Sequence, residues 1–232
     1  MKRTMADNLM RSLSAPSNRI ARDDALTARQ IRRIMVDMCL RRQKPGAGSD
    51  PAFLRRKTAM IPWPDLRATL QGIPWAIVGG VATRAYMPER ATKDLDILIQ
   101  TADSDRVLAR LKAADYLLVA TLGIPGYVLQ SPAGIEIDLL LSDDPWLEEA
   151  LAVVGRDAAG YPVLALPYLV LMKLSSMRSQ DWADVSRMLG LAGEAELERV
   201  RDVVGRYSSE DLEDLEALID LGRRELQPPG AP

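Results

Sequence analysis

The chain has 232 residues, 47% of them hydrophobic, with one cysteine (Cys39) and no histidine. One cysteine excludes an intrachain disulfide, and the lack of histidine excludes triads and zinc sites built on imidazole. No apolar run approaches the roughly 18 residues of a membrane span, and no secretion signal is visible, so we expect a cytoplasmic protein without membrane contact. Any catalysis must use carboxylates, basic side chains, hydroxyls or a hard metal ion.

The basic charge is concentrated in the first quarter of the chain. Residues 1–57 hold 14 Lys/Arg and 5 Asp/Glu, a net charge of +9, whereas residues 58–232 hold 16 and 27, a net charge of −11. A basic segment beside an acidic body indicates either contact with RNA, DNA or an acidic partner, or docking of the segment onto the body. Composition does not decide between the two.

Within this segment, "TARQIRRIMVDMCLRRQ" (27–43) has the spacing of a helix, with Thr27 as its N-cap and arginines along one face. The other face is apolar and consists of Ile31, Met35, Met38 and Cys39. Such a face more often packs than recognises a ligand, which keeps docking as a strong alternative to RNA contact. The Gly- and Pro-rich stretch "KPGAGSDP" (44–51) predicts a linker.

Beyond the linker, apolar runs divided by Gly and Pro turns alternate with helical patterns. The expected strands are 75–80, 94–100, 116–121, 126–131, 134–142 and 161–167. The expected helices are 64–72, 81–88, 104–116, 144–155, 168–189 and two acidic helices within 193–226. This order predicts an α/β (α+β) fold, a small mixed β-sheet core of roughly five strands flanked by helices. We divide the chain into a basic N-terminal helical arm with its linker (1–57), a core (58–165) and a helical C-terminal lobe (166–232).

The stretch "DLDILIQ" (94–100) places two carboxylates in a strand that otherwise has the composition of a buried one. Side chains alternate along a strand, so Asp94, Asp96 and Leu98 share one face while the odd-numbered apolar residues face the core. Alone, an Asp-x-Asp tripeptide is common, and exposure on an edge strand would explain it.

A second strand repeats the pattern. In "GIEIDLLLS" (134–142), Glu136 and Asp138 share a face. If this strand neighbours the first, three or four carboxylates converge, and their mutual repulsion is costly unless a cation binds there. Ligands that are all oxygen suit Mg²⁺ or Mn²⁺. The two strands together therefore favour a metal site over an exposed edge.

Gly79 and Gly80 lie between an apolar strand and a helical pattern, fourteen residues before Asp94. Glycine at such a junction lets backbone N–H groups approach an anion, beside the positive end of a helix. An ordinary tight turn is the alternative. Followed by the Asp-x-Asp strand, the pair favours a triphosphate held by backbone amides and metal ions.

The succession "VGG…RATKDLDILI…IDLL" resembles the nucleotidyltransferase superfamily typified by DNA polymerase β. The resemblance covers about residues 70–190 and makes residues 58–165 its catalytic core. It implies that Asp94, Asp96 and Asp138 bind two divalent metal ions and that Asp138 also acts on the attacking hydroxyl. It further implies that Gly79 and Gly80 contact the phosphates of the nucleoside triphosphate.

Within that superfamily, "RATKDLD" and "LPYLVLMKLSSMRSQDWADVSRML" are most similar to the AbiE-type toxins and related bacterial enzymes. The matches on the second segment are Lys173, Arg178, Asp181 and Asp184. Lys173 would neutralise phosphate charge, assisted by Arg178, or these residues form a salt-bridge cluster that fixes a helix. Arg90 contacts phosphate in one interpretation and closes a loop in the other. The basic arm matches no element of this group.

Three functions are compatible with these residues. The first is Mg²⁺-dependent transfer of NMP from an NTP to an RNA or protein hydroxyl, for instance by the toxin of a toxin–antitoxin pair, with RNA and an antitoxin protein as partners. The second is transfer to a small molecule, as antibiotic-modifying relatives perform. The third is a nucleotide-binding module of the same fold without catalysis, against which the complete set of acids argues.

Overall fold

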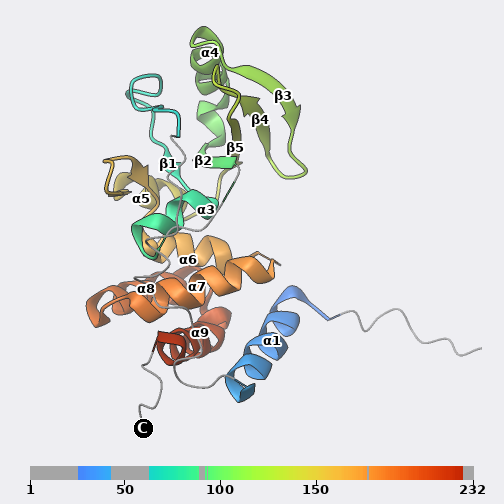
Figure 1. Cartoon of the computed structure of the whole chain (residues 1–232), viewed down its shortest axis with the longest axis vertical. Helices are drawn as coiled ribbons and strands as arrows, with labels where there is room; N and C mark the ends of the chain where they lie inside the picture. The colour runs from blue at the N-terminus through green and yellow to red at the C-terminus, as the bar shows by residue number, and fades with distance from the viewer. Residues whose placement is uncertain (1–25, 43–62, 89–91, 93, 177, 227–232) are drawn as a thin grey trace, which may run out of the picture.

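A β-sheet and a stack of helices make up the part of the chain that the computed structural model describes, residues 26–42, 63–88, 92, 94–176 and 178–226. Figure 1 shows the sheet with helix α4 at one end and helices α6 to α9 at the other. The strands are β1 (Ala76–Ile77), β2 (Asp94–Gln100), β3 (Leu117–Thr121), β4 (Gly126–Gln130), β5 (Glu136–Ser142), β6 (Gly155–Arg156) and β7 (Pro162–Val163). The α-helices are α1 (Ala28–Arg42), α3 (Gly79–Ala82), α4 (Ser104–Ala113), α5 (Leu147–Ala152), α6 (Leu166–Leu174), α7 (Ser179–Leu191), α8 (Glu194–Tyr207) and α9 (Leu212–Leu226).

Within the described residues, seven strands form one sheet in the order β3-β4-β5-β2-β1-β7-β6. β2 and β5 run parallel, as do β1 and β7, and the other neighbours are antiparallel. The predicted fold class, a mixed α/β sheet flanked by helices, is therefore confirmed. The sheet exceeds the roughly five strands expected because two-residue strands such as β6 leave no periodic signal in a sequence.

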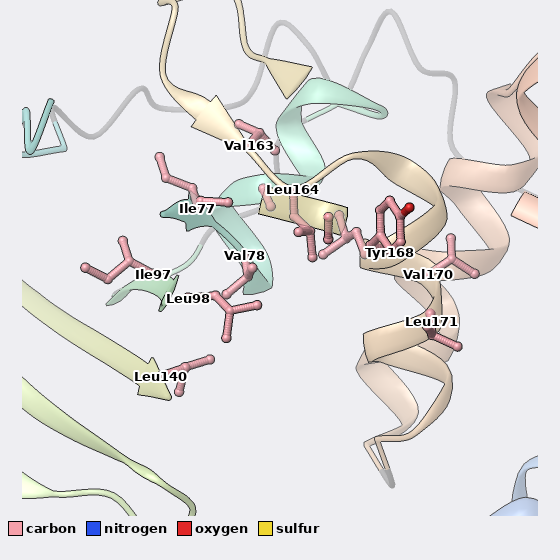
Figure 2. Close-up of a cluster of buried hydrophobic side chains, with 14 of the residues drawn as sticks. Ile77, Val78, Ile97, Leu98, Leu140, Val163, Leu164, Tyr168, Val170 and Leu171 are labelled. Carbon is pink, nitrogen blue, oxygen red and sulfur yellow. The ribbon is translucent and has the colours of Figure 1, made fainter. Parts of the chain in front are cut away.

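The main core lies where the middle of the sheet meets α6. Figure 2 shows Ile77, Leu98 and Leu140 of neighbouring strands facing Leu164 and Tyr168. All five side chains are buried. Asp94, Asp96 and Leu98 lie on the same face of β2, and Leu98 is buried in this core. The two carboxylates therefore lie at the edge of the core.

The predicted N-cap of the first helix is confirmed, whereas of its apolar face only Ile31 packs against the core, and Met35, Met38 and Cys39 are exposed. Thr27 Oγ1 accepts from the N–H of Gln30 at 3.2 Å, and Gln30 Oε1 accepts from the N–H of Thr27 at 2.7 Å, a reciprocal capping box. The Met35 and Met38 side chains are 42% and 47% exposed, while Arg32 of the opposite face is 2% exposed. α1 therefore docks through Arg32, which meets the carboxylate of Asp214 on α9, and through Val36, which is 5% exposed.

The expected helix over 64–72 is instead a series of turns. Asp65 Oδ1 accepts from the N–H of Arg67 at 3.0 Å. The N–H of Leu70 reaches back four residues to Leu66 O, but those of Gln71 and Ile73 reach back only three. An aspartate that bonds the backbone two residues on competes with helix formation at its start. Gly72, at φ +71°, ends the segment.

No helix within the described ranges combines the length and apolar character that crossing a bilayer requires.

α7 and α9 cross with their backbones in direct contact. A Cβ at Gly222 would lie 1.9 Å from the carbonyl oxygen of Ser186, and one at Gly190 would lie 2.5 Å from Gly222 C. α9 buries Leu215, Leu218, Ile219 and Gly222, which is one face at helical spacing. Small residues therefore set the distance between the two helices.

Gly222→Ala should lower the free energy of unfolding by about 2–3 kcal/mol, because the added methyl forces two backbones apart. Gly205→Ala in α8 is the matched control, since its Cβ would meet only Leu212 side-chain carbons at 3.8 and 4.0 Å. Relief of the helical cost of glycine should stabilise that variant by about 0.5–1 kcal/mol. Urea unfolding measures both, and equal stability of the two variants would contradict the close crossing.

Candidate functional site

Three carboxylates meet at the boundary between β2 and β5. The parallel register pairs Asp96 with Asp138 and Asp94 with Glu136. One oxygen from each of Asp94, Asp96 and Asp138 lies within 4.8 Å of the others, and all three residues are half-buried. Glu136 is exposed and stands outside this group. The two strands are thus neighbours, and of the four acids considered in the sequence, three converge.

The proximity of these acids changes their protonation. Burial raises the pKa of Asp96 to about 6, and the charges of Asp94 and Asp138 add to the effect. Burial and the charges of Asp94 and Glu136 likewise raise the pKa of Asp138 above its usual range. Thr92 Oγ1 donates to Asp94 Oδ1 at 2.8 Å and orients that carboxylate. The cluster stores electrostatic repulsion that a bound cation would relieve.

The donor set fits a divalent metal ion. Asp138 Oδ1 is buried and has no hydrogen-bond partner among the described residues. A buried oxygen without a partner costs free energy, which coordination to a cation would recover. Three carboxylates supply the hard oxygen ligands that Mg²⁺ or Mn²⁺ prefers.

The two glycines pack against this cluster. Gly79 adopts φ +60°, and a Cβ there would lie 1.8 Å from Asp96 Oδ2. The N–H of Gly80 donates to Asp96. Gly79 and Gly80 therefore contact the carboxylate of Asp96. Their contact with a phosphate stays a prediction. Only glycine combines this backbone conformation with so close an approach.

A cavity of about 950 Å³ opens beside the cluster, between the sheet and the start of the helical stack. Gly79, Asp96 and Asp138 line it from the sheet, and Lys173 and Arg178 line it from the helices. Its apolar lining comprises Leu98, Leu122, Ile124, Pro125, Leu140, Leu141, Trp146 and Met172. A volume of this size accommodates a nucleotide-sized ligand.

The helix expected over 168–189 is two helices, and the break lies at the cavity. α6 ends at Leu174, and Arg178 has extended backbone angles at the start of α7. Ser176 Oγ accepts from the N–H of Arg178 at 3.0 Å and donates to Asp181 at 2.6 Å. Such local side-chain bonds compete with a continuous helix.

The break brings Lys173 onto two aspartates of α7. Its Nζ lies 2.5 Å from Asp181 Oδ1 and 3.0 Å from Asp184 Oδ2, and all three side chains are buried. Burial by itself would raise the pKa of Asp181. Its interactions with Lys173, Ser176 and Arg178 outweigh burial, so the pKa lies below its usual value. The ammonium of Lys173 is thus engaged by carboxylates at the wall of the cavity, and its contact with a nucleotide stays a prediction.

Arg178 differs from Lys173 in its exposure. Its side chain is 76% exposed and donates to Asp181 Oδ2 at 2.6 Å. Partial burial lowers the pKa of this guanidinium, but the carboxylates of Asp181, Asp96 and Asp94 raise it more. The group therefore stays charged beside the cluster, with its other face open to the cavity. Arg90, the remaining expected phosphate contact, lies outside the described residues.

Sequence reasoning missed the apolar wall of the cavity. Leu122, Ile124 and Pro125 come from the link between β3 and β4, and Met172 comes from α6. No spacing in the sequence joins these segments, so no local signal could have found the wall. Thr92 was also missed, although its position two residues before Asp94 could have suggested a hydroxyl that orients the carboxylate.

No protein-family model matches the chain, and no curated protein matches it either. Among solved structures, it is similar to ANT(2")-Ia in complex with adenylyl-2"-tobramycin, at 16% identity and a TM-score of 0.37, over 67% of this chain and 92% of that one. It is also similar to terminal uridylyl transferase 4 from Trypanosoma brucei with bound GTP (10% identity, TM-score 0.27, 86% and 70% covered). A CCA-adding enzyme with CTP matches at 12% identity and a TM-score of 0.31, with 82% and 53% covered. These names include a uridylyl transferase and a CCA-adding enzyme, but every TM-score is below 0.5, so the likeness carries no conclusion about function.

Proposed function

We propose that the chain is a divalent-metal-dependent nucleotidyltransferase that uses an NTP as donor. The observation that carries the proposal is the group of Asp94, Asp96 and Asp138 within 4.8 Å of one another, beside a cavity of about 950 Å³. These three residues would hold Mg²⁺ or Mn²⁺. When bound, the metal supplies Lewis-acid polarisation of phosphoryl oxygens and neutralises developing charge.

The chain's own residues supply position and charge. The exposed guanidinium of Arg178 binds the triphosphate, and Lys173, held by Asp181 and Asp184, gives the cavity wall a fixed cation. The acceptor hydroxyl attacks the α-phosphorus, the bond from α-phosphorus to the bridging oxygen breaks, and pyrophosphate leaves. Asp138 takes the hydroxyl proton, since its carboxylate lines the cavity and lies within 4.8 Å of the other two acids.

We place a small-molecule acceptor first. Arg29, Arg32 and Arg33 of α1 are paired with Asp211 or Asp214, so part of the positive charge of the arm is engaged within the molecule. The cavity is partly apolar and carries the exposed acids Asp143 and Asp144 in its lining, and these features suit a small acceptor better than a second polyanion beside the triphosphate. Transfer to RNA or protein, an AbiE-type toxin role and an antitoxin partner stay predictions from the sequence, as does the division at residues 57 and 165.

An NTP should raise the melting temperature by about 5–10 °C at one hundred times its dissociation constant, and only with Mg²⁺ or Mn²⁺ present. The reason is that the triphosphate meets three carboxylates, whose repulsion a divalent ion must first offset. Thermal shift with each NTP, in Mg²⁺ and in EDTA, measures this. Asp138→Asn is the matched control and should lose the shift. Equal stabilisation by NTP in EDTA would contradict the proposal.

A further inference from the structure

Arginine–carboxylate pairs join α1 to α9 and to the 3₁₀ turn that precedes α9 (Ser209–Asp211). Arg29 lies 2.8 Å from Asp211, Arg32 lies 2.5 Å from Asp211 and 2.9 Å from Asp214, and Arg33 lies 3.1 Å from Asp214. Figure 1 shows α1 alongside α9, at the end of the molecule away from β3 and β4. Burial distinguishes the three cations, because the side chain of Arg32 is 3% exposed while those of Arg29 and Arg33 are 44% and 48% exposed.

Arg32 also reaches a third element. Its Nη1 donates to the carbonyl oxygen of Leu174, the last residue of α6. Carbonyls at the end of a helix have no partner within that helix, and a cation there is favourable for the helix dipole. The guanidinium therefore joins α1, α9 and the end of α6 in one buried contact.

The end of α6 is also the wall of the candidate active site. Lys173 precedes Leu174 and binds Asp181 and Asp184, while Ser175 and Ser176 follow it and line the cavity. The N–H of Ser175 donates to Leu171 O, and that of Ser176 donates to Lys173 O. A contact that holds the Leu174 carbonyl in place therefore also holds the last turn of α6, which carries Lys173.

We propose that Arg32 is a positioning residue, through which docking of α1 orders the end of α6 and the Lys173–Asp181 pair at the nucleotide site. Its effect on nucleotide binding rests on the proposed function, whereas its effect on the order of α6 does not. The basic arm thereby acts on the site through packing, from behind the cavity wall.

Arg32→Met tests this with little collateral damage. Asp211 keeps Arg29 and the hydroxyl of Ser208, which donates at 2.6 Å, and Asp214 keeps Arg33. Neither buried carboxylate is left without a cation, and methionine preserves most of the apolar volume of the side chain. The variant loses the ion pairs of Arg32 with Asp211 and Asp214 and its bond to Leu174 O, and of these only the bond to Leu174 connects α1 to α6. Arg33→Met is the control, because Arg33 shares Asp214 with Arg32, binds Glu213 as its second acid, and makes no bond to α6 within the described part of the chain.

The first measurement is amide hydrogen exchange of the full-length chain without nucleotide. Arg32→Met should speed exchange of the Ser175, Ser176 and Asp181 amides about tenfold, the loss expected for one hydrogen bond to a charged group. Amides of β2 and β5 should keep their rates, and Arg33→Met should change neither region. Uniformly faster exchange throughout the chain would overturn the proposal, since Arg32 would then be a residue of general stability.

The second measurement is the dissociation constant of whichever Mg²⁺-bound NTP stabilises the wild type. It should rise about tenfold in Arg32→Met and recover in part in Arg32→Lys, which retains a donor for the Leu174 carbonyl. Faster exchange at Ser175 and Ser176 with an unchanged dissociation constant would also overturn the positioning role. If the wild type binds no NTP, the proposed function fails, and the exchange result alone decides whether Arg32 orders α6.

Discussion

Asp96→Asn is expected to lower nucleotidyl transfer by about three orders of magnitude while the chain stays folded. Asp96 is the member of the cluster that both Asp138 and the Gly79–Gly80 turn contact, so its loss removes a ligand from the centre of the metal site. Metal ions supply several kcal/mol of transition-state stabilisation, which converts to that factor. Metal-dependent pyrophosphate release and calorimetric Mn²⁺ titration measure the two effects.

The same substitution should stabilise the metal-free protein at neutral pH. The folded-state pKa of Asp96 is raised to about 6, so the folded chain holds this proton more tightly than the unfolded chain does. Stability therefore falls as pH rises from about 4 through 6, and this loss is absent when the residue is asparagine. The variant should gain about 1–3 kcal/mol at pH 7.5 and almost nothing at pH 4, as measured by urea unfolding in EDTA.

Glu136→Gln is the matched control for both effects. It removes an exposed charge from the same pair of strands, in register with Asp94, but outside the cluster of three. Its transfer rate should stay within about threefold of the wild type, as for ordinary surface changes. A metal affinity in Asp96→Asn equal to that of the wild type would refute the metal site. An equal loss of transfer rate in Glu136→Gln would show that any nearby negative charge has this effect, and that Asp96 is not a specific ligand.

Gly79→Ala is expected to abolish metal binding and to lower the free energy of unfolding by about 2–5 kcal/mol. The backbone at φ +60° strains any side chain, and the added Cβ would lie 1.8 Å from Asp96 Oδ2 and 2.5 Å from Asp96 Cγ. Strain accounts for about 1–2 kcal/mol, and overpacking accounts for the rest. Because the carboxylate must move away from Asp138, the metal site opens as well.

Gly134→Ala separates the two causes. Gly134 has φ +80°, and nothing lies within 4 Å of the Cβ that alanine would add. This variant should therefore carry the strain alone, about 1–2 kcal/mol, and bind Mn²⁺ like the wild type. Urea unfolding and Mn²⁺ titration of both variants provide the comparison. Equal losses of stability, with metal binding intact in Gly79→Ala, would show that the contact with Asp96 does not matter.

Alternation along single strands allowed the sequence to predict which carboxylates share a face. Asp94 and Asp96 are two residues apart on β2, and Asp138 has the same place on β5, so each strand's contribution follows from its period of two. The cap at Thr27 was predictable for the same reason, because the hydroxyl and Gln30 lie three residues apart. Interactions between residues this close depend on spacing, and spacing is what a sequence displays.

Contacts between distant segments were decided only by the tertiary structure. Arg32 of α1 is buried because Asp211 and Asp214, 179 and 182 residues away in the sequence, offer it carboxylates, a contact that the spacing within α1 does not indicate. The α6–α7 break likewise sets Lys173 against Asp181 and Asp184 where a single helix was expected. Whether β2 neighbours β5, and in which register, also depends on chain topology, because strand periodicity fixes the face of a side chain but not its partner across the sheet. The sequence thus determined which carboxylates share a face of their strand. Their convergence was decided by the pairing of β2 with β5, which places Asp96 beside Asp138.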